Sequence, residues 1–160
     1  MPPQLLFPID GIDLAKITIP IEEIRKVNAQ RFEMEQLDGI LAVDAAEGWA
    51  VGVKNIRHDE FWQRGHIPGR PIMPGVVLLE CAAQLSSYLV MTRMGLTHGS
   101  VFMGFAGLDH VRFRGTVVPG DRLIILAKNI EARARVSRSR CQGLVGEKMV
   151  FECEVMGMML

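Results

Sequence analysis

The amino-acid sequence predicts an α+β fold in which an antiparallel β-sheet surrounds one long, buried α-helix. Residues 76–94 contain neither proline nor glycine and few charged side chains, which is typical of a helix buried on nearly all sides. Short apolar stretches bounded by turn residues precede and follow this helix, as expected for strands. One sheet packed on the helix is the simplest arrangement of these elements.

The strands are predicted from their apolar residues and from the turn residues between them. Glu47-Gly48 separates the first two strands, which indicates an antiparallel hairpin, and Pro119-Gly120-Asp121 marks a later turn. Glycines at 104 and 107 predict a kink in the strand that contains them. The expected strands are residues 40–44, 49–56, 102–113, 122–135, 137–146 and 148–156.

The N-terminal part of the chain is punctuated by prolines. Residues 21–27 follow Pro20 and predict a short helix, and residues 58–63 predict a helical turn. We expect residues 1–30 to form an extension packed on a single domain of residues 31–160. One helix cannot cover both faces of a sheet and leaves an edge strand exposed, so we also expect self-association.

Composition restricts the class of protein. A chain of 160 residues with no net charge predicts one domain that binds neither nucleic acid in general nor a membrane. The central helix comes closest to a membrane span, but its polar residues argue against that use. The three cysteines Cys81, Cys141 and Cys153 lack metal-ligand spacing, so we expect a reducing, cytoplasmic setting and no metal site.

Residues 65–75 form the most distinctive stretch of the chain. Three prolines and three glycines within this segment predict a stiff loop that leads into the central helix. Such a loop holds one shape, which suits a side chain that must point accurately. His66 is the candidate.

The central helix carries one narrow polar stripe, formed by Glu80, Gln84 and Ser87. A carboxyl group on a buried helix costs several kcal/mol unless it is paired or protonated. A lone histidine or glutamate usually has a structural or solvent-facing role. The combination of a stiff loop, His66 and a solitary acid on a buried helix favours catalysis.

These residues also resemble a known family. The segment Gly65-His-Ile-Pro-Gly-Arg-Pro-Ile-Met-Pro-Gly-Val76, with Glu80 and Gln84, resembles the central motif of the bacterial 3-hydroxyacyl-[acyl-carrier-protein] dehydratases of the FabZ type. The similarity covers about residues 38–156. It implies the hot-dog fold, an antiparallel sheet wrapped around a long helix, in homodimers that often assemble as a trimer of dimers.

The resemblance implies a hydro-lyase that converts 3-hydroxyacyl-[acyl-carrier-protein] to the trans-2-enoyl form in fatty acid biosynthesis. His66 matches the catalytic base and Glu80 the catalytic acid, supplied by opposite subunits, and Gln84 matches the residue that orients the acid. A glutamate at position 80 favours dehydration without migration of the double bond. The reaction requires neither a metal nor an organic cofactor.

Other residues are assigned from this reaction. The N–H groups of Gly75 and Val76 at the helix N-terminus are placed to stabilise charge on the thioester oxygen. Arg112 and Arg114 match contacts to the acidic acyl carrier protein. The apolar candidates for the acyl tunnel, for which core packing is an equal alternative, are Ile72, Met73, Phe102, Met103 and Phe105.

Several alternatives remain open. Residues 31–37 replace the Tyr-Pro-Phe-Leu-Leu segment that is usual in the family, and Ile67 replaces a usual phenylalanine. The sequence does not reveal the preferred length of the acyl chain. A hot-dog thioesterase or acyl-CoA hydratase, a non-catalytic carrier-binding module, and the same dehydration in polyketide or specialised lipid synthesis are the rival functions.

Overall fold

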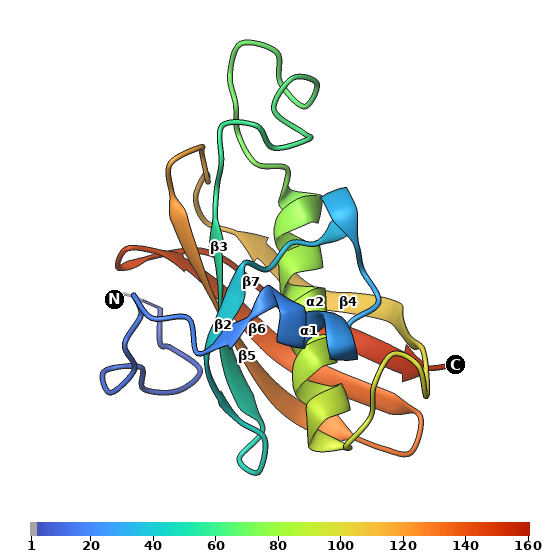
Figure 1. The fold of residues 1–160 in the computed structure, drawn as a ribbon. Coiled ribbons are helices and arrows are strands. Elements are labelled where there is room, and N and C mark those ends of the chain that lie inside the picture. The colour runs from blue at the N-terminus through green and yellow to red at the C-terminus, as the bar shows by residue number, and fades with distance from the viewer. Residues whose placement is uncertain (1–2) are drawn as a thin grey trace.

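Helix α2 (Gly75–Arg93) lies across one face of a seven-stranded antiparallel sheet (Figure 1). The computed structural model describes residues 3–160. The strand order is β1-β2-β3-β5-β6-β7-β4, so β1 and β4 are the edges of the sheet. The strands are β1 (Ile19–Pro20), β2 (Gly39–Asp44), β3 (Trp49–Asn55), β4 (Met103–Phe113), β5 (Arg122–Ala132), β6 (Val136–Val145) and β7 (Lys148–Met159). The short helices are α1 (Ile21–Val27) and the 3₁₀ turn η1 (Phe32–Met34).

The long helix ends where the sequence predicts. Gly95 adopts a φ of 67°, in the region that favours glycine, and the N–H of Leu96 donates to the carbonyl of Met91. The helix is long and apolar enough to cross a membrane by those two criteria, but most of it is buried inside the protein. Its apolar side chains pack on the sheet and form the main core with residues such as Ile125 and Phe151.

A second apolar cluster lies on the opposite face of the sheet. Strand residues such as Val51 and Leu126 are fully buried there. The N-terminal segment covers them, and in Figure 1 it lies on the side of the sheet away from α2. Its partly buried members are Leu5, Leu6, Phe7, Ile9, Ile12 and Leu14. A single helix leaves this face open, and residues 5–14 remove its apolar surface from water.

The predicted fold class is confirmed: the arrangement is the hot-dog fold. The predicted hairpin forms between β2 and β3. The expected kink near Gly107 is present as a register shift between Phe105 and Gly107 where β4 pairs with β7. The predicted helical turn at residues 58–63 is a series of turns without an assigned helix: the N–H of Gln63 donates to the carbonyl of Glu60, and the N–H of His66 donates to that of Trp62.

Candidate functional site

The loop that carries His66 is fixed at both ends by backbone hydrogen bonds. The N–H of His66 donates to the carbonyl of Trp62 at 2.9 Å, and the N–H of Met73 donates to the carbonyl of Val117 at 2.8 Å. Gly69 lies between them with a φ of 77°, which a side chain would disfavour. The loop therefore holds one shape although its surface is exposed, as its prolines and glycines predict.

The imidazole of His66 is exposed, and one of its nitrogens is already committed. Nδ1 lies 2.7 Å from the carbonyl oxygen of Ile72. Because a carbonyl can only accept a hydrogen bond, Nδ1 must carry a proton and donate it. In the neutral ring the lone pair is then on Nε2, which is the arrangement that a general base requires.

The carboxyl group of Glu80 is half-buried on α2 and is held by Gln84, one turn further along the helix. Nε2 of Gln84 donates to Oε1 of Glu80 at 2.7 Å. Burial raises the pKa of the Glu80 carboxyl above its ordinary value, and the hydrogen bond from Gln84 opposes this by favouring the ionised form. A raised pKa keeps part of the population protonated, as a general acid requires.

Gln84 itself is buried and fully hydrogen-bonded. Its Oε1 accepts the backbone N–H of Gln36 at 2.9 Å, and its Nε2 also donates to the carbonyl of Met34 at 2.5 Å. An N–H can only donate and a carbonyl can only accept, so these two contacts fix which end of the amide is nitrogen. Gln84 therefore presents an N–H, and not its oxygen, to Glu80.

Glu80 lines a cavity of about 140 Å³ between α2 and the first residues of β4. Three of the five predicted tunnel residues, Phe102, Met103 and Phe105, line it too. The other two lie elsewhere in one chain: Ile72 lines a surface groove beside the His66 loop, and Met73 is buried in the main core. His66 is not among the residues of the cavity that contains Glu80.

The N-terminus of α2 has two free amides. Within residues 3–160, no acceptor lies in hydrogen-bonding reach of the N–H groups of Gly75 and Val76, and Pro74 provides no side-chain cap. Val76 is 74% exposed. A Cβ at Gly75 would lie 2.6 Å from the ring of Phe113, so a larger residue there requires this ring to move.

The two arginines predicted to contact a carrier protein are both exposed on or after β4. Arg114 forms an ion pair with Glu152, whereas the guanidinium of Arg112 bonds only to the carbonyl of Val111 within the described chain. The later basic residues Arg138 and Arg140 both pair with Glu154. Glu154 thus offsets part of the positive charge on this strand.

Cys81 is fully buried in the main core beside Glu80. Burial raises the pKa of its thiol to about 12, so a thiolate does not form near neutral pH. Cys141 is also buried, with its sulfur 3.2 Å from the hydroxyl of Ser86. The structure thus places both thiols in the core.

Some residues at the site had no signal in the sequence. Gln30 and Ser137 line the cavity of Glu80. Gln30 follows α1 and Ser137 lies on β6, more than one hundred positions later. Lys54 and Glu60 form a buried ion pair at 3.3 Å, just before the His66 loop. Only the tertiary fold brings Gln30 and Ser137 to the cavity.

Comparisons with known proteins identify the family of this chain. The sequence model of the FabA-like domain family matches residues 28–154. The chain is 35% identical to the 3-hydroxyacyl-[acyl-carrier-protein] dehydratase FabZ of Hydrogenobaculum sp. (strain Y04AAS1), over 84% of this chain and 90% of the relative. It is 36% identical to the FabZ of Escherichia coli O9:H4 (strain HS), over 87% and 91% of the two chains.

Solved structures share the fold at low sequence identity. The dehydratase heterocomplex ApeI:P from Xenorhabdus doucetiae matches with a TM-score of 0.72 at 11% identity, over 86% of this chain and 90% of that one. A hypothetical thioesterase with coenzyme A from Streptococcus pneumoniae TIGR4 matches with a TM-score of 0.59, also at 11% identity, over 76% and 84%. By its sequence relatives, the chain belongs to the FabA-like family, as a member of its FabZ-type 3-hydroxyacyl-[acyl-carrier-protein] dehydratases.

Proposed function

We propose that this protein dehydrates 3-hydroxyacyl-[acyl-carrier-protein] to the trans-2-enoyl form in bacterial fatty acid biosynthesis, with His66 as base and Glu80 as acid. Nε2 of His66 removes a proton from C2 of the acyl chain. The electron pair forms the C2–C3 double bond as the C3–O bond breaks, and the proton of Glu80 joins the departing hydroxyl to form water. The observation that carries the proposal is the fixed tautomer of His66, whose Nδ1 is bound to Ile72.

The two groups are proposed to meet between two chains. His66 is exposed on a loop, and the cavity of Glu80 has no base of its own. Edge strand β4, eleven residues long, contributes three residues to that cavity and has one side without a partner strand in the described chain. A second copy docked at this edge would bring its own His66 to the cavity. A homodimer is the minimal active unit, and three dimers form the hexamer that the family resemblance implies.

The thioester oxygen is proposed to bind at the N-terminus of α2. Removal of the C2 proton places negative charge on this oxygen, and the free N–H groups of Gly75 and Val76 can both donate to it. The helix dipole adds to the stabilisation within the first turn. Gln84 orients the acid. The acyl chain extends along the cavity beside Phe102, Met103 and Phe105.

The acyl carrier protein is proposed to dock on the surface that includes Arg112 and Arg114. Arg112 carries a positive charge without an ion-pair partner in the described chain, and Arg114 is neutralised by Glu152, so Arg112 is the stronger candidate. We propose that the reaction takes place in the bacterial cytoplasm, and the acyl-carrier-protein substrates in the relatives' names support this location.

The decisive assay uses purified protein and a carrier-linked 3-hydroxyacyl thioester. We expect a rise in enoyl absorbance without release of free thiol, and loss of at least about 100-fold in rate for His66→Ala and for Glu80→Gln with the fold retained. Release of free thiol would instead identify a thioesterase. Binding of the carrier without turnover, unchanged in His66→Ala, would identify a non-catalytic binding module.

A further inference from the structure

The 25–36 segment, which runs from the last turn of α1 toward β2, holds the Gln84 amide by its backbone. The carbonyl of Met34 and the N–H of Gln36 are the two groups that fix this amide, as described above. Both lie where the sequence departs from the pattern usual in the family. The orientation of the proposed acid therefore depends on a segment whose conformation must itself be fixed.

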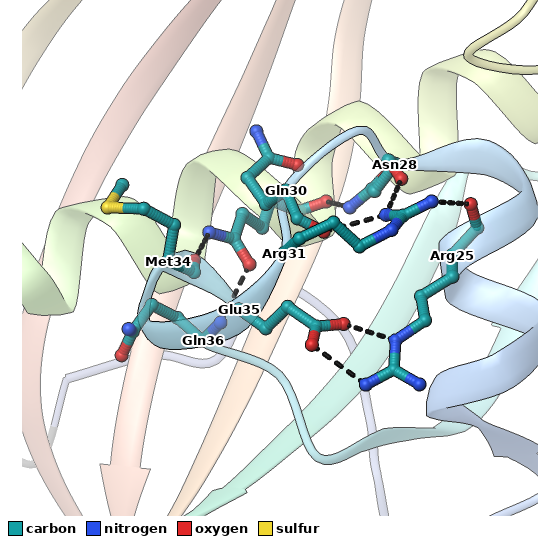
Figure 2. Close-up of polar contacts among 8 residues, drawn as sticks. Arg25, Asn28, Gln30, Arg31, Met34, Glu35 and Gln36 are labelled. Atoms are coloured by element: carbon teal, nitrogen blue, oxygen red, sulfur yellow. Dashed lines mark hydrogen bonds and ion pairs between the residues drawn. The ribbon is translucent and has the colours of Figure 1, made fainter.

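An ion pair closes this segment into a loop. The guanidinium of Arg25 donates two hydrogen bonds to Glu35, from Nε at 2.7 Å and from Nη2 at 2.8 Å (Figure 2). A two-bond pair between arginine and a carboxylate is geometrically specific. Glu35 lies between Met34 and Gln36, so the pair restrains the two backbone groups that hold Gln84.

Further contacts brace the same loop. The guanidinium of Arg31 donates to the carbonyls of Arg25, Asn28 and Gln30, and Figure 2 shows these contacts on one side of the loop. The side chain of Asn28 donates to the backbone carbonyl of Gln84 at 2.9 Å. The loop is thus attached to α2 at Gln84 through both its backbone and a side chain.

The backbone of the loop is strained. Phe32 adopts a φ of 55°, and its side chain is 86% exposed. A bulky residue rarely adopts this conformation, which persists only where surrounding contacts impose it. Burial of the phenylalanine within one chain does not compensate, so the shape depends on the backbone hydrogen bonds of the turn together with the contacts of Arg25, Arg31 and Glu35.

We propose that the Arg25–Glu35 ion pair is a positioning clamp for the acid Glu80. By fixing Met34 and Gln36, the clamp keeps an N–H of Gln84 on Oε1 of Glu80, so that the proton of the acid is carried by Oε2. Arg25 and Glu35 are positioning residues that touch no substrate. The expected effect of the clamp on kcat rests on the proposed function. The restraint of Gln84 by the clamp does not.

Gln84 is the one side chain that contributes a hydrogen bond to the pKa of Glu80 in the described chain. Burial and Gln84 are the two causes that act on the pKa of Glu80, and no charged side chain adds to them in the described chain. Lys54, on a strand packed against α2, forms an ion pair with Glu60. The carboxylate of Glu35 is itself paired with Arg25.

The test compares Glu35→Gln and Arg25→Lys with the charge swap that combines Arg25→Glu and Glu35→Arg. We expect each single variant to lower kcat by about 10-fold with little change in KM, since a misplaced acid affects the chemical step more than binding. In these single variants the alkaline limb of the pH profile of kcat should move. The swap should recover a large part of kcat, which loss of fold could not explain.

A matched control and a direct readout separate the outcomes. Glu23→Gln removes the exposed pair with Lys26 on the same helix and should leave kcat unchanged. The side-chain amide signal of Gln84 in NMR, assigned by its loss in Gln84→Glu, should shift in Glu35→Gln and Arg25→Lys but not in the control. Its shift tests the clamp even if the wild type does not dehydrate the substrate.

The clamp is overturned if the wild type is active while Glu35→Gln and Arg25→Lys both keep its kcat, its pH profile and its Gln84 signal. That result would leave the proposed function intact. A wild-type protein without dehydratase activity, whose Gln84 signal still responds to Glu35→Gln, would instead overturn the proposed function and support the clamp.

Discussion

The amide of Gln84 donates one N–H to Glu80, 2.7 Å away and one helical turn earlier on α2. The second N–H and the oxygen of this amide are committed to the backbone of residues 34 and 36. Gln84 thus links an early segment of the chain to the carboxyl group that is proposed to protonate the leaving hydroxyl. The remaining consequences of the structure can be tested residue by residue.

Gln84→Leu should lower kcat by about 10- to 100-fold, because Glu80 loses the contact that orients it. The lost hydrogen bond favoured the ionised carboxylate, so the pKa of Glu80 should rise further and the alkaline limb of kcat should move to higher pH. A pH–rate profile on a carrier-linked substrate measures both effects. An alkaline limb that moves to lower pH would contradict this assignment.

Glu80→Gln should stabilise the fold increasingly as pH rises. Between the ordinary pKa of glutamate and the raised pKa in the folded state, the folded protein binds more protons at Glu80 than the unfolded chain does. The free energy of unfolding of the wild type therefore falls as pH rises through that interval. The Glu80→Gln variant does not lose stability in this way, because its amide does not titrate. Urea titrations of both proteins at several pH values measure the difference, which should be smallest at acid pH.

Lys54→Met should destabilise the protein by about 3–5 kcal/mol, because it leaves the carboxylate of Glu60 buried without its partner. Lys54 and Glu60 are only 3% and 4% exposed. The double variant with Glu60→Met should recover much of that stability. The free energies of unfolding from denaturant titration decide this, and a double variant no more stable than Lys54→Met would contradict it.

The N-terminal segment should contribute to stability through the second apolar cluster. The rings of Phe7 and Trp49 lie 5.0 Å apart on the outer face of the sheet. Phe7→Ala should lower the free energy of unfolding by about 1–2 kcal/mol. Leu160→Ala is the matched control, because Leu160 is 72% exposed and should change stability little. Equal effects of the two substitutions would refute a stabilising role for the segment.

Arg112→Glu should lower activity on a carrier-linked substrate, and the activity of the wild type should fall as ionic strength rises. Activity on a small thioester substrate without the carrier should depend neither on Arg112→Glu nor on ionic strength. Lys16→Glu makes the same change of charge at an exposed position in the N-terminal segment, and it serves as the control. If Arg112→Glu and Lys16→Glu behave alike, the carrier does not dock through Arg112.

Much of the fold follows from local sequence properties. The apolar stretch of residues 76–94 predicts α2 to within one residue at each end, and turn residues locate the β2–β3 hairpin. The stiff loop of His66 also follows from its prolines and glycines. These features depend on neighbours in the sequence, where propensity and turn chemistry act directly.

Other features depend on contacts between distant residues and leave no local signal. The alternation of apolar residues does not reveal that Leu5 and Phe7 cover the outer face of the sheet. The polar residues 30–36 resemble a solvated loop, yet they hold Gln84, about fifty positions away. Ile72 and Met73 have the apolar character of tunnel residues, and only the three-dimensional packing separates them from Phe102 and Phe105.

The most direct test of the central claim is complementation between His66→Ala and Glu80→Gln. Each variant alone should be inactive. If the two residues come from opposite subunits, a mixed dimer contains one intact site, and random mixing of the chains should restore about one quarter of the wild-type rate. Recovery near that level is the predicted result. No recovery in dimers shown to contain both chains would contradict the account, because it would place His66 and Glu80 of each site in the same chain.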